Sequence, residues 1–164
     1  MGHPSLGLPP DDPVAGRPAA AARLRAGREQ LAERSLAAAI ARDPTLVDRY
    51  DETARRTFLR DYLQHAEQLA RALETGRAHW LTDYVDWIVP VMRRRHVPMR
   101  DVATIVQGLG DATAAMLPPD DEASTRAIVE DAVARLDRPR HLPGDRPRGR
   151  IASLLWKAAG IGGW

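Results

Sequence analysis

RAHWLTDYVDWIVPVMRRRH, residues Arg77–His96, is the most apolar helical stretch of the chain. Its large side chains form two adjacent stripes with the three- and four-residue spacing of an α-helix. The first stripe contains Trp80, Tyr84, Trp87 and Val91, and the second contains Leu81, Val85, Ile88 and Met92. Together they make a wide apolar face, which predicts that this helix lies at the centre of a bundle. Pro90 removes one backbone donor, so a kink is expected there.

Helices are also expected on the N-terminal side of this stretch. The first runs over Pro18–Arg42, although Gly27 weakens its middle. Asp43 and Pro44 then provide an N-cap and a first-turn residue for a short helix that reaches Tyr50. The next helix, Asp51–Thr75, ends at Gly76. Its apolar stripe contains Phe58, Tyr62, His65, Leu69 and Leu73.

Two more amphipathic helices are expected on the C-terminal side. The helix over Met99–Leu117 carries its core stripe at Val102, Ile105, Val106, Leu109, Thr113 and Met116. The helix over Asp120–Arg138 has acidic residues first and basic residues last, and its expected core residues are Ala123, Ile128, Ala132, Val133 and Leu136. Because β-branched residues are sparse throughout, the sequence predicts an all-α fold, a single bundle of about five helices.

Composition divides the chain into four segments. Residues 1–17 are rich in Pro, Gly and Asp and are expected to be a disordered arm. Residues 18–138 form the helical bundle domain, and residues 139–148 form a linker rich in Pro and Arg. Residues 149–164, GRIASLLWKAAGIGGW, follow as a short amphipathic peptide.

The C-terminal peptide has the pattern of a docking helix. Its apolar stripe is formed by Ile151, Leu154, Leu155 and Ala158, and Arg150, Ser153 and Lys157 share the opposite face. A helix this short is marginal in water by itself, so it is expected to fold against another surface. The residues predicted to bind a partner are Arg148, Arg150, Ile151, Leu154, Leu155, Trp156, Lys157 and Trp164. The alternative is that this peptide folds back onto the bundle as a further helix.

The positive charge of the chain is concentrated at its C-terminal end. The formal net charge is +2 from 24 basic and 22 acidic residues. Residues 138–164 hold six Lys or Arg against one Asp, a local excess of +5, so the preceding residues sum to −3. A basic tail suits an acidic protein or an anionic membrane surface. Nucleic acid is not expected as a partner, because no helix with base-reading side chains is apparent.

One cluster could form a ligand pocket. His65, Trp80, Tyr84 and Trp87 could line a site for haem, a tetrapyrrole or another flat apolar molecule. Aromatic stripes at helical spacing are more often core, however, and His65 is more often a histidine bonded to a neighbouring polar group. A pH-sensing role for His65 is the further alternative. The sequence therefore gives no positive indication of a cofactor, and no metal site is expected.

No pattern in the chain predicts catalysis. Asp83 and Asp86 lie three residues apart, which favours a solvated face or ion pairs with Arg over acid–base chemistry. The chain has no cysteine and no phosphate-binding glycine loop. We therefore expect no catalytic residue and no enzyme activity. Residues 1–10 lack the features of a secretory signal, so a cytoplasmic location is expected.

The layout of the chain from Leu46 to Leu136 resembles a known family, and three segments carry the resemblance. They are Asp43-Pro-Thr-Leu-Val-Asp-Arg-Tyr50 leading into 53–76, Tyr84-Val-Asp-Trp87, and Arg94-Arg-His-Val-Pro-Met-Arg-Asp-Val102. This layout resembles the N-terminal regulatory domain of RsbR/RsbRD-type stress-signalling proteins, which also precedes some PucR-type regulators. In that family Gly is common at the position of His96.

The resemblance implies a globin-like helical bundle, usually without haem, that acts through partner contacts and often forms a homodimer. It carries no catalytic residue to this chain. Together with the tail, it predicts a non-enzymatic regulatory or adaptor module that docks on a larger protein assembly through residues 149–164. A ligand-sensing or haem-sensing helical domain, and a peripheral membrane protein using the same tail, are the alternatives.

Overall fold

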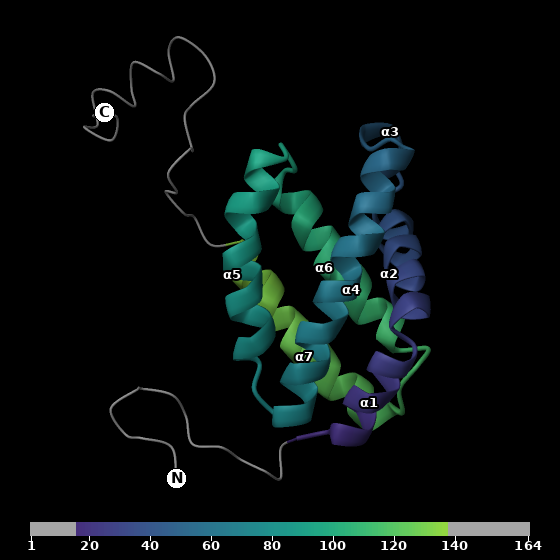
Figure 1. The fold of residues 1–164 in the computed structure, drawn as a ribbon, viewed down its shortest axis with the longest axis vertical. Helices are drawn as coiled ribbons and strands as arrows, with labels where there is room; N and C mark the ends of the chain where they lie inside the picture. The colour runs from purple at the N-terminus through teal and green to yellow at the C-terminus, as the bar shows by residue number, and fades with distance from the viewer. Residues whose placement is uncertain (1–15, 138–164) are drawn as a thin grey trace, which may run out of the picture.

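The computed structural model describes residues 16–137, and it confirms the all-α prediction (Figure 1). Within these residues there are seven helices: α1 (Pro18–Ala26), α2 (Arg28–Arg42), α3 (Leu46–Arg49), α4 (Glu52–Thr75), α5 (His79–Arg94), α6 (Met99–Thr113) and α7 (Pro119–Leu136). The predicted helix over Pro18–Arg42 is divided at Gly27, which explains part of the excess over about five helices. The arm over residues 1–15 and the segments 139–148 and 149–164 lie outside the described residues.

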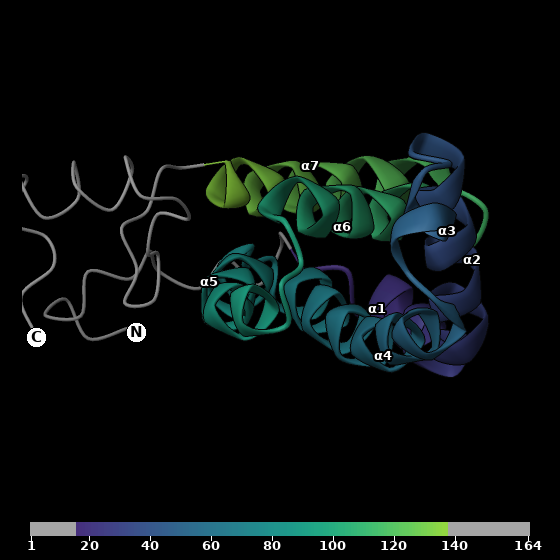
Figure 2. The same cartoon turned by 90° about the horizontal axis from the view of Figure 1, so that it is seen from above.

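The central helix of the bundle is α4. It packs against α1, α2, α5, α6 and α7. The whole predicted stripe of this helix is buried, namely Phe58, Tyr62, His65, Leu69 and Leu73. Helices α6 and α7 lie side by side in one layer, α4 lies with α5 and α1 in a second, and α2 closes the side opposite α5 (Figure 2). The apolar face of α4 therefore organises the core.

The prediction that the Arg77–His96 helix is central was wrong. This segment forms α5, which packs against α4, α6 and α7 and leaves its other side to solvent. The stripe formed by Leu81, Val85, Ile88 and Met92 is buried, with no member more than 3% exposed. The neighbouring stripe is only partly covered, since Tyr84 packs against the core whereas Trp80 is 37% and Trp87 is 66% exposed. Two apolar stripes are thus not enough to place a helix at the centre.

Helices α2 and α6 approach each other closely at Gly108. A Cβ atom at this position would lie 2.5 Å from the carbonyl oxygen of Ser35 and 2.8 Å from the backbone nitrogen of Ala39. Tyr62 fastens the same region from α4, because its buried hydroxyl donates to the carbonyl of Ile105 at 2.8 Å. Because glycine has no side chain, α2 and α6 can approach each other closely at Gly108, and Tyr62 joins α4 to the same region.

The helix ends explain several boundaries. Asp51 caps α4 by accepting a hydrogen bond of 2.8 Å from the Ala54 nitrogen. Gly76 ends α4 with φ 67°, a left-handed conformation that glycine adopts without strain. His96, which follows α5, is a non-glycine residue in the same region with φ 60°. Asp43 was expected to be the N-cap of the short helix, but Thr45 holds that position in α3.

The predicted core of the last helix is partly wrong. In α7, Ile128, Ala132 and Leu136 are buried as expected, whereas Ala123 is exposed. Thr125 and Val129 take part in the core instead. The helical register accounts for this, because positions 125, 129, 132 and 136 recur every three or four residues on the face toward the core.

Candidate functional site

The outward side of α5 is the candidate functional site. We use the term aromatic face for its residues Trp80, Asp83, Tyr84 and Trp87, which share one side of the helix because they recur at three- and four-residue intervals. Of the large hydrophobic residues described, only Val47, Trp80 and Trp87 are exposed, and two of them belong to this face. An exposed tryptophan pair on one helix face is unusual for a surface that makes no contacts.

The aromatic face is connected to the core by a stack of rings. Trp87 stacks on Tyr84 with ring centroids 5.9 Å apart. Tyr84 meets His65 of α4 edge to face at 5.4 Å, and its hydroxyl lies 3.0 Å from Nδ1 of His65. Tyr62 completes the row with a centroid distance of 5.6 Å to His65. The row therefore runs from the buried α4 side to the solvent side of α5.

His65 is sealed inside the bundle. It is 1% exposed, and its Nε2 atom has no hydrogen-bond partner. Burial lowers the pKa of His65 to about 4, so the imidazole is neutral at physiological pH. A neutral imidazole speaks against the alternative that His65 senses pH near neutrality. Its expected bond to a carbonyl or carboxylate is a contact with the Tyr84 hydroxyl instead.

The four residues predicted to line a ligand pocket do not share one cavity wall. His65 and Tyr84 are in direct contact at 3.0 Å, which leaves no space between them for a haem. Trp80 and Trp87 lie on the same side of α5 as Tyr84 but are 37% and 66% exposed. Burial of Tyr84, and the nearby negative charge of Asp61, raise the pKa of the Tyr84 hydroxyl, so it remains protonated.

Trp80 occupies the N-terminal end of the aromatic face. It stacks on His79 with ring centroids 5.2 Å apart. The guanidinium of Arg71, on α4, lies 5.5 Å from the centre of the Trp80 ring, a cation–π contact. These contacts restrict the ring while leaving 37% of the residue exposed. Trp80 is therefore presented in a fixed orientation.

The two carboxylates of α5 behave differently. Asp86 accepts a hydrogen bond of 3.0 Å from Arg135 of α7, as the expected ion pairing with Arg requires. Asp83 is exposed and makes no hydrogen bond or ion pair within residues 16–137. It lies between Trp80 and Trp87 on the aromatic face, so the face combines two apolar rings with one free negative charge.

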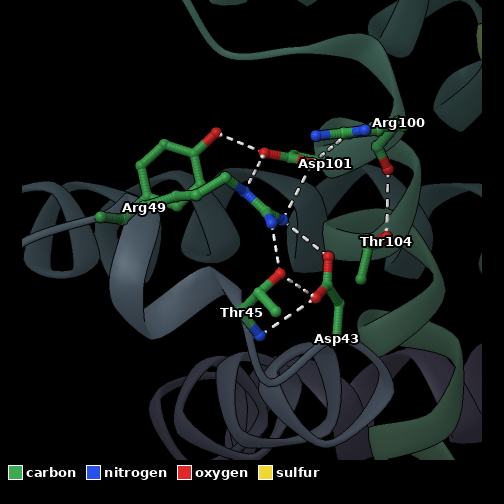
Figure 3. A network of polar contacts seen from close by, with 7 residues as sticks. Asp43, Thr45, Arg49, Arg100, Asp101 and Thr104 are labelled. Carbon is green, nitrogen blue, oxygen red and sulfur yellow. Dashed lines mark hydrogen bonds and ion pairs between the residues drawn. The ribbon is translucent and has the colours of Figure 1, made fainter.

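A second cluster surrounds Asp101 of α6 (Figure 3). This carboxylate is 0% exposed. Arg49 donates to both of its oxygens at 3.1 Å, and the Tyr50 hydroxyl donates at 2.7 Å. Arg49 also binds Asp43 at 2.6 Å. The hydrogen bond from Thr45, followed by that from Arg49, holds the pKa of Asp43 below its usual value. The cluster joins two of the segments that resemble the RsbR-type domain.

Sequence reasoning missed the role of Asp101. The available signal was its position four residues before Ile105, which places a charge on the apolar face of the predicted helix. A buried carboxylate requires partners, and Arg49 and Tyr50 provide them from 52 and 51 residues away. No spacing rule links residues so far apart, so the contact itself could not be predicted. The cluster is fully engaged internally and serves as a structural joint.

Three further points concern metal binding, membrane spans and the C-terminal peptide. Within residues 16–137, no three His, Asp or Glu side chains are arranged to hold a metal ion. No helix in that range combines the length and apolar character needed to cross a bilayer. The predicted partner-binding residues Arg148, Arg150, Ile151, Leu154, Leu155, Trp156, Lys157 and Trp164 lie outside the described residues.

Comparison with known proteins gives no family for the chain. No protein-family model matches it, and no curated protein sequence matches it. The resemblance to the RsbR-type regulatory domain therefore stays a prediction based on the three quoted segments.

Proposed function

We propose that this chain is a non-enzymatic regulatory or adaptor module that docks on a partner protein through residues 149–164. The observation that carries the proposal is the exposure of Trp87 on the aromatic face, 66% of the residue, close to the end of α7. Exposed tryptophans are enriched where proteins bind one another, because they bury a large area at low entropic cost. The aromatic face and the basic tail would thus form one interaction region.

The polar groups of the bundle support a role without catalysis. Asp101 is buried and paired with Arg49, and His65 is buried and neutral. Neither group is accessible to a substrate. Charged residues that remain exposed, such as Asp83, can steer a partner. Signalling by contact is the role that these surfaces fit.

The resemblance to the RsbR-type regulatory domain implies the same class of function. It also implies a homodimer, and we propose a cytoplasmic setting for the interaction. Both points are open to direct measurement by light scattering of the purified chain and by cell fractionation. The oligomeric state and the location do not alter which surface is proposed to bind the partner.

A quantitative pull-down tests the proposal. The full chain is compared with a chain ending at Arg148, with the variant Trp87→Ala and with the variant Val47→Ala. Val47 is 43% exposed on α3, away from the aromatic face, so it provides a matched control for loss of an exposed apolar side chain. We expect the full chain and Val47→Ala to capture the same protein. The truncated chain should lose it, and Trp87→Ala should retain less of it.

The contrary result is equally clear. If all four proteins captured the same partners in the same amounts, neither the tail nor Trp87 would be the docking element. The proposed mode of action would then be wrong.

A further inference from the structure

The aromatic face is uncovered by residues 16–137 although the described chain ends beside it. Arg135, two residues before that end, bonds to Asp86 at 3.0 Å, and Asp86 is the neighbour of Trp87 in sequence. Figure 1 shows the C-terminal end of α7 next to α5. The described chain therefore ends beside α5, at the side that carries Asp86.

The charges around this edge are negative. Asp83 lies on the aromatic face without an ion pair among residues 16–137, and Asp131 and Asp137 are exposed near the end of α7. Over 130–137, the C-terminal half of α7 and its cap contain three acidic residues and one basic residue, a formal charge of −2. Residues 138–164 carry +5. The tail and the surface beside it are thus complementary in charge.

The apolar surfaces of the aromatic face and of the tail also match in length. The aromatic face offers an apolar surface, from Trp80 to Trp87, that is two helical turns long. The apolar stripe of the tail, from Ile151 to Ala158, also spans two turns. Arg150 and Lys157 give the polar face of this peptide its positive charge. A basic amphipathic helix is therefore the chemistry that this surface fits.

Chain length favours an intramolecular contact over an intermolecular one. The 13 residues from 138 to 150 can span about 40 Å when extended, and the whole of α5 is about 24 Å long. A tether of this length holds the peptide at an effective concentration on the order of millimolar. The peptide therefore meets its own α5 at this effective concentration. The α5 of a second molecule is present only at the bulk concentration of the protein, so the intramolecular contact is favoured.

We propose that residues 149–164 cover the aromatic face of α5 in the same molecule, and that the partner displaces them. The displacement step rests on the proposed function, whereas the intramolecular contact does not. The bound tail would shield Trp87 and keep its own apolar stripe from other proteins. Release would expose the tail and the aromatic face together, so the chain would have a closed and an open state.

Paramagnetic NMR of the full chain tests the contact without altering α5. Because the chain has no cysteine, the variant Ser153→Cys accepts a single nitroxide label on the polar side of the tail. The label should broaden the indole N–H signals of Trp87 and Trp80, so that each loses more than half of its intensity relative to the reduced sample. Trp87→Phe and Trp80→Phe identify the two signals.

Two controls define the result. A nitroxide at Glu33→Cys, exposed on α2 at the side of the bundle opposite α5, should leave both indole signals unchanged. Adding Leu154→Asp and Leu155→Asp to the labelled tail should restore both signals, because the apolar stripe is then lost. Full restoration would show that the broadening requires docking and does not come from a freely moving tail.

Three outcomes would overturn the proposal. The first is equal intensities in the oxidised and reduced samples. The second is equal broadening with the two Asp substitutions. The third is broadening of equal size when ¹⁵N chains without label are mixed with labelled chains at natural isotope abundance, which would assign the face to a second copy. None of these results decides whether the tail binds a partner, so the pull-down of the proposed function remains a separate test.

Discussion

The hydroxyl of Tyr50 donates a hydrogen bond of 2.7 Å to the carboxylate of Asp101, which ties the end of α3 to the first turn of α6. Arg49 occupies both oxygens of the same carboxylate from the adjacent position in sequence. Burial of Tyr50 and its bond to Asp101 raise the pKa of the phenol, so the donor stays protonated. A buried charge is tolerated here because each of its oxygens has a donor.

The pairing predicts that removing the charge of Asp101 destabilises the fold more than removing the charge of Asp111, another carboxylate of α6. Asp101→Asn keeps the size of the side chain but removes the charge that balances Arg49, and we expect the free energy of unfolding to fall by about 2 kcal/mol. Asp111 forms the matched control, because it also binds an arginine, Arg42, but both side chains are over 40% exposed. Asp111→Asn should cost less than about 1 kcal/mol.

Urea unfolding followed by circular dichroism measures both values. Equal losses for Asp101→Asn and Asp111→Asn would mean that the buried joint contributes no more than a surface ion pair.

Gly108 provides a test of the contact between α2 and α6. In Gly108→Ala the new methyl group would lie 2.5 Å from the backbone oxygen of Ser35, so the two helices must separate. We expect a loss of about 3 kcal/mol, because backbone atoms cannot move aside as a side chain can. Gly110→Ala is the control in the same helix, where the nearest atom is a Val129 methyl at 3.1 Å.

For Gly110→Ala the gain in helix propensity, about 1 kcal/mol, offsets most of the tighter contact. Its thermal midpoint should therefore stay close to that of the parent chain, while the midpoint of Gly108→Ala should fall clearly. Similar midpoints for the two variants would argue against close packing at Gly108.

The regular part of the fold follows from the sequence. The stripe of α4 from Phe58 to Leu73 has a 3.6-residue period between a good N-cap, Asp51, and a terminating Gly76, so pattern and end signals agree. In α6, Val102, Ile105 and Leu109 are buried as expected, but the helix ends at Thr113, before the predicted end at Leu117. Local periodicity is sufficient where one face of a helix is apolar and the other is charged.

Periodicity fails where burial depends on neighbours. Trp80 and Trp87 have the spacing of core residues but stay 37% and 66% exposed, while the adjacent stripe of α5 is buried. The candidate site therefore emerged from exposure, which the sequence does not encode locally. In the same way, the partners of Asp101 are determined by the tertiary arrangement of α3 and α6.

His96 and Gly76 both have positive φ, so introducing glycine at position 96 should stabilise the fold and removing glycine at position 76 should destabilise it. His96 adopts φ 60°, where a side chain is strained, so His96→Gly should raise the free energy of unfolding by up to about 1 kcal/mol. Gly76 has φ 67°, and Gly76→Ala should lower it by about 1 kcal/mol. Guanidinium unfolding of both variants checks the signs. A loss of stability in His96→Gly would show that the contacts of the imidazole outweigh its backbone strain.

His65 predicts a specific dependence of stability on pH. In the folded chain burial lowers the pKa of His65 from 6.5 to about 4. Between these values the unfolded chain binds the proton and the folded chain does not. The contribution of His65 is therefore fully present above pH 6.5, declines as the pH falls, and is lost at about pH 4. The full change amounts to about 3 kcal/mol, since each pKa unit corresponds to about 1.4 kcal/mol.

The variant His65→Gln separates this contribution from that of the carboxylates. Gln retains a polar group next to the Tyr84 hydroxyl but does not titrate, so its stability should decline less between pH 6.5 and pH 4 than that of the parent chain. Urea unfolding at half-unit pH intervals gives the two curves. They should converge toward low pH even if the variant is less stable at pH 7. Parallel curves would mean that the folded bundle accommodates a protonated His65, and that the imidazole is less completely sealed by Tyr62 and Tyr84 than their contacts indicate.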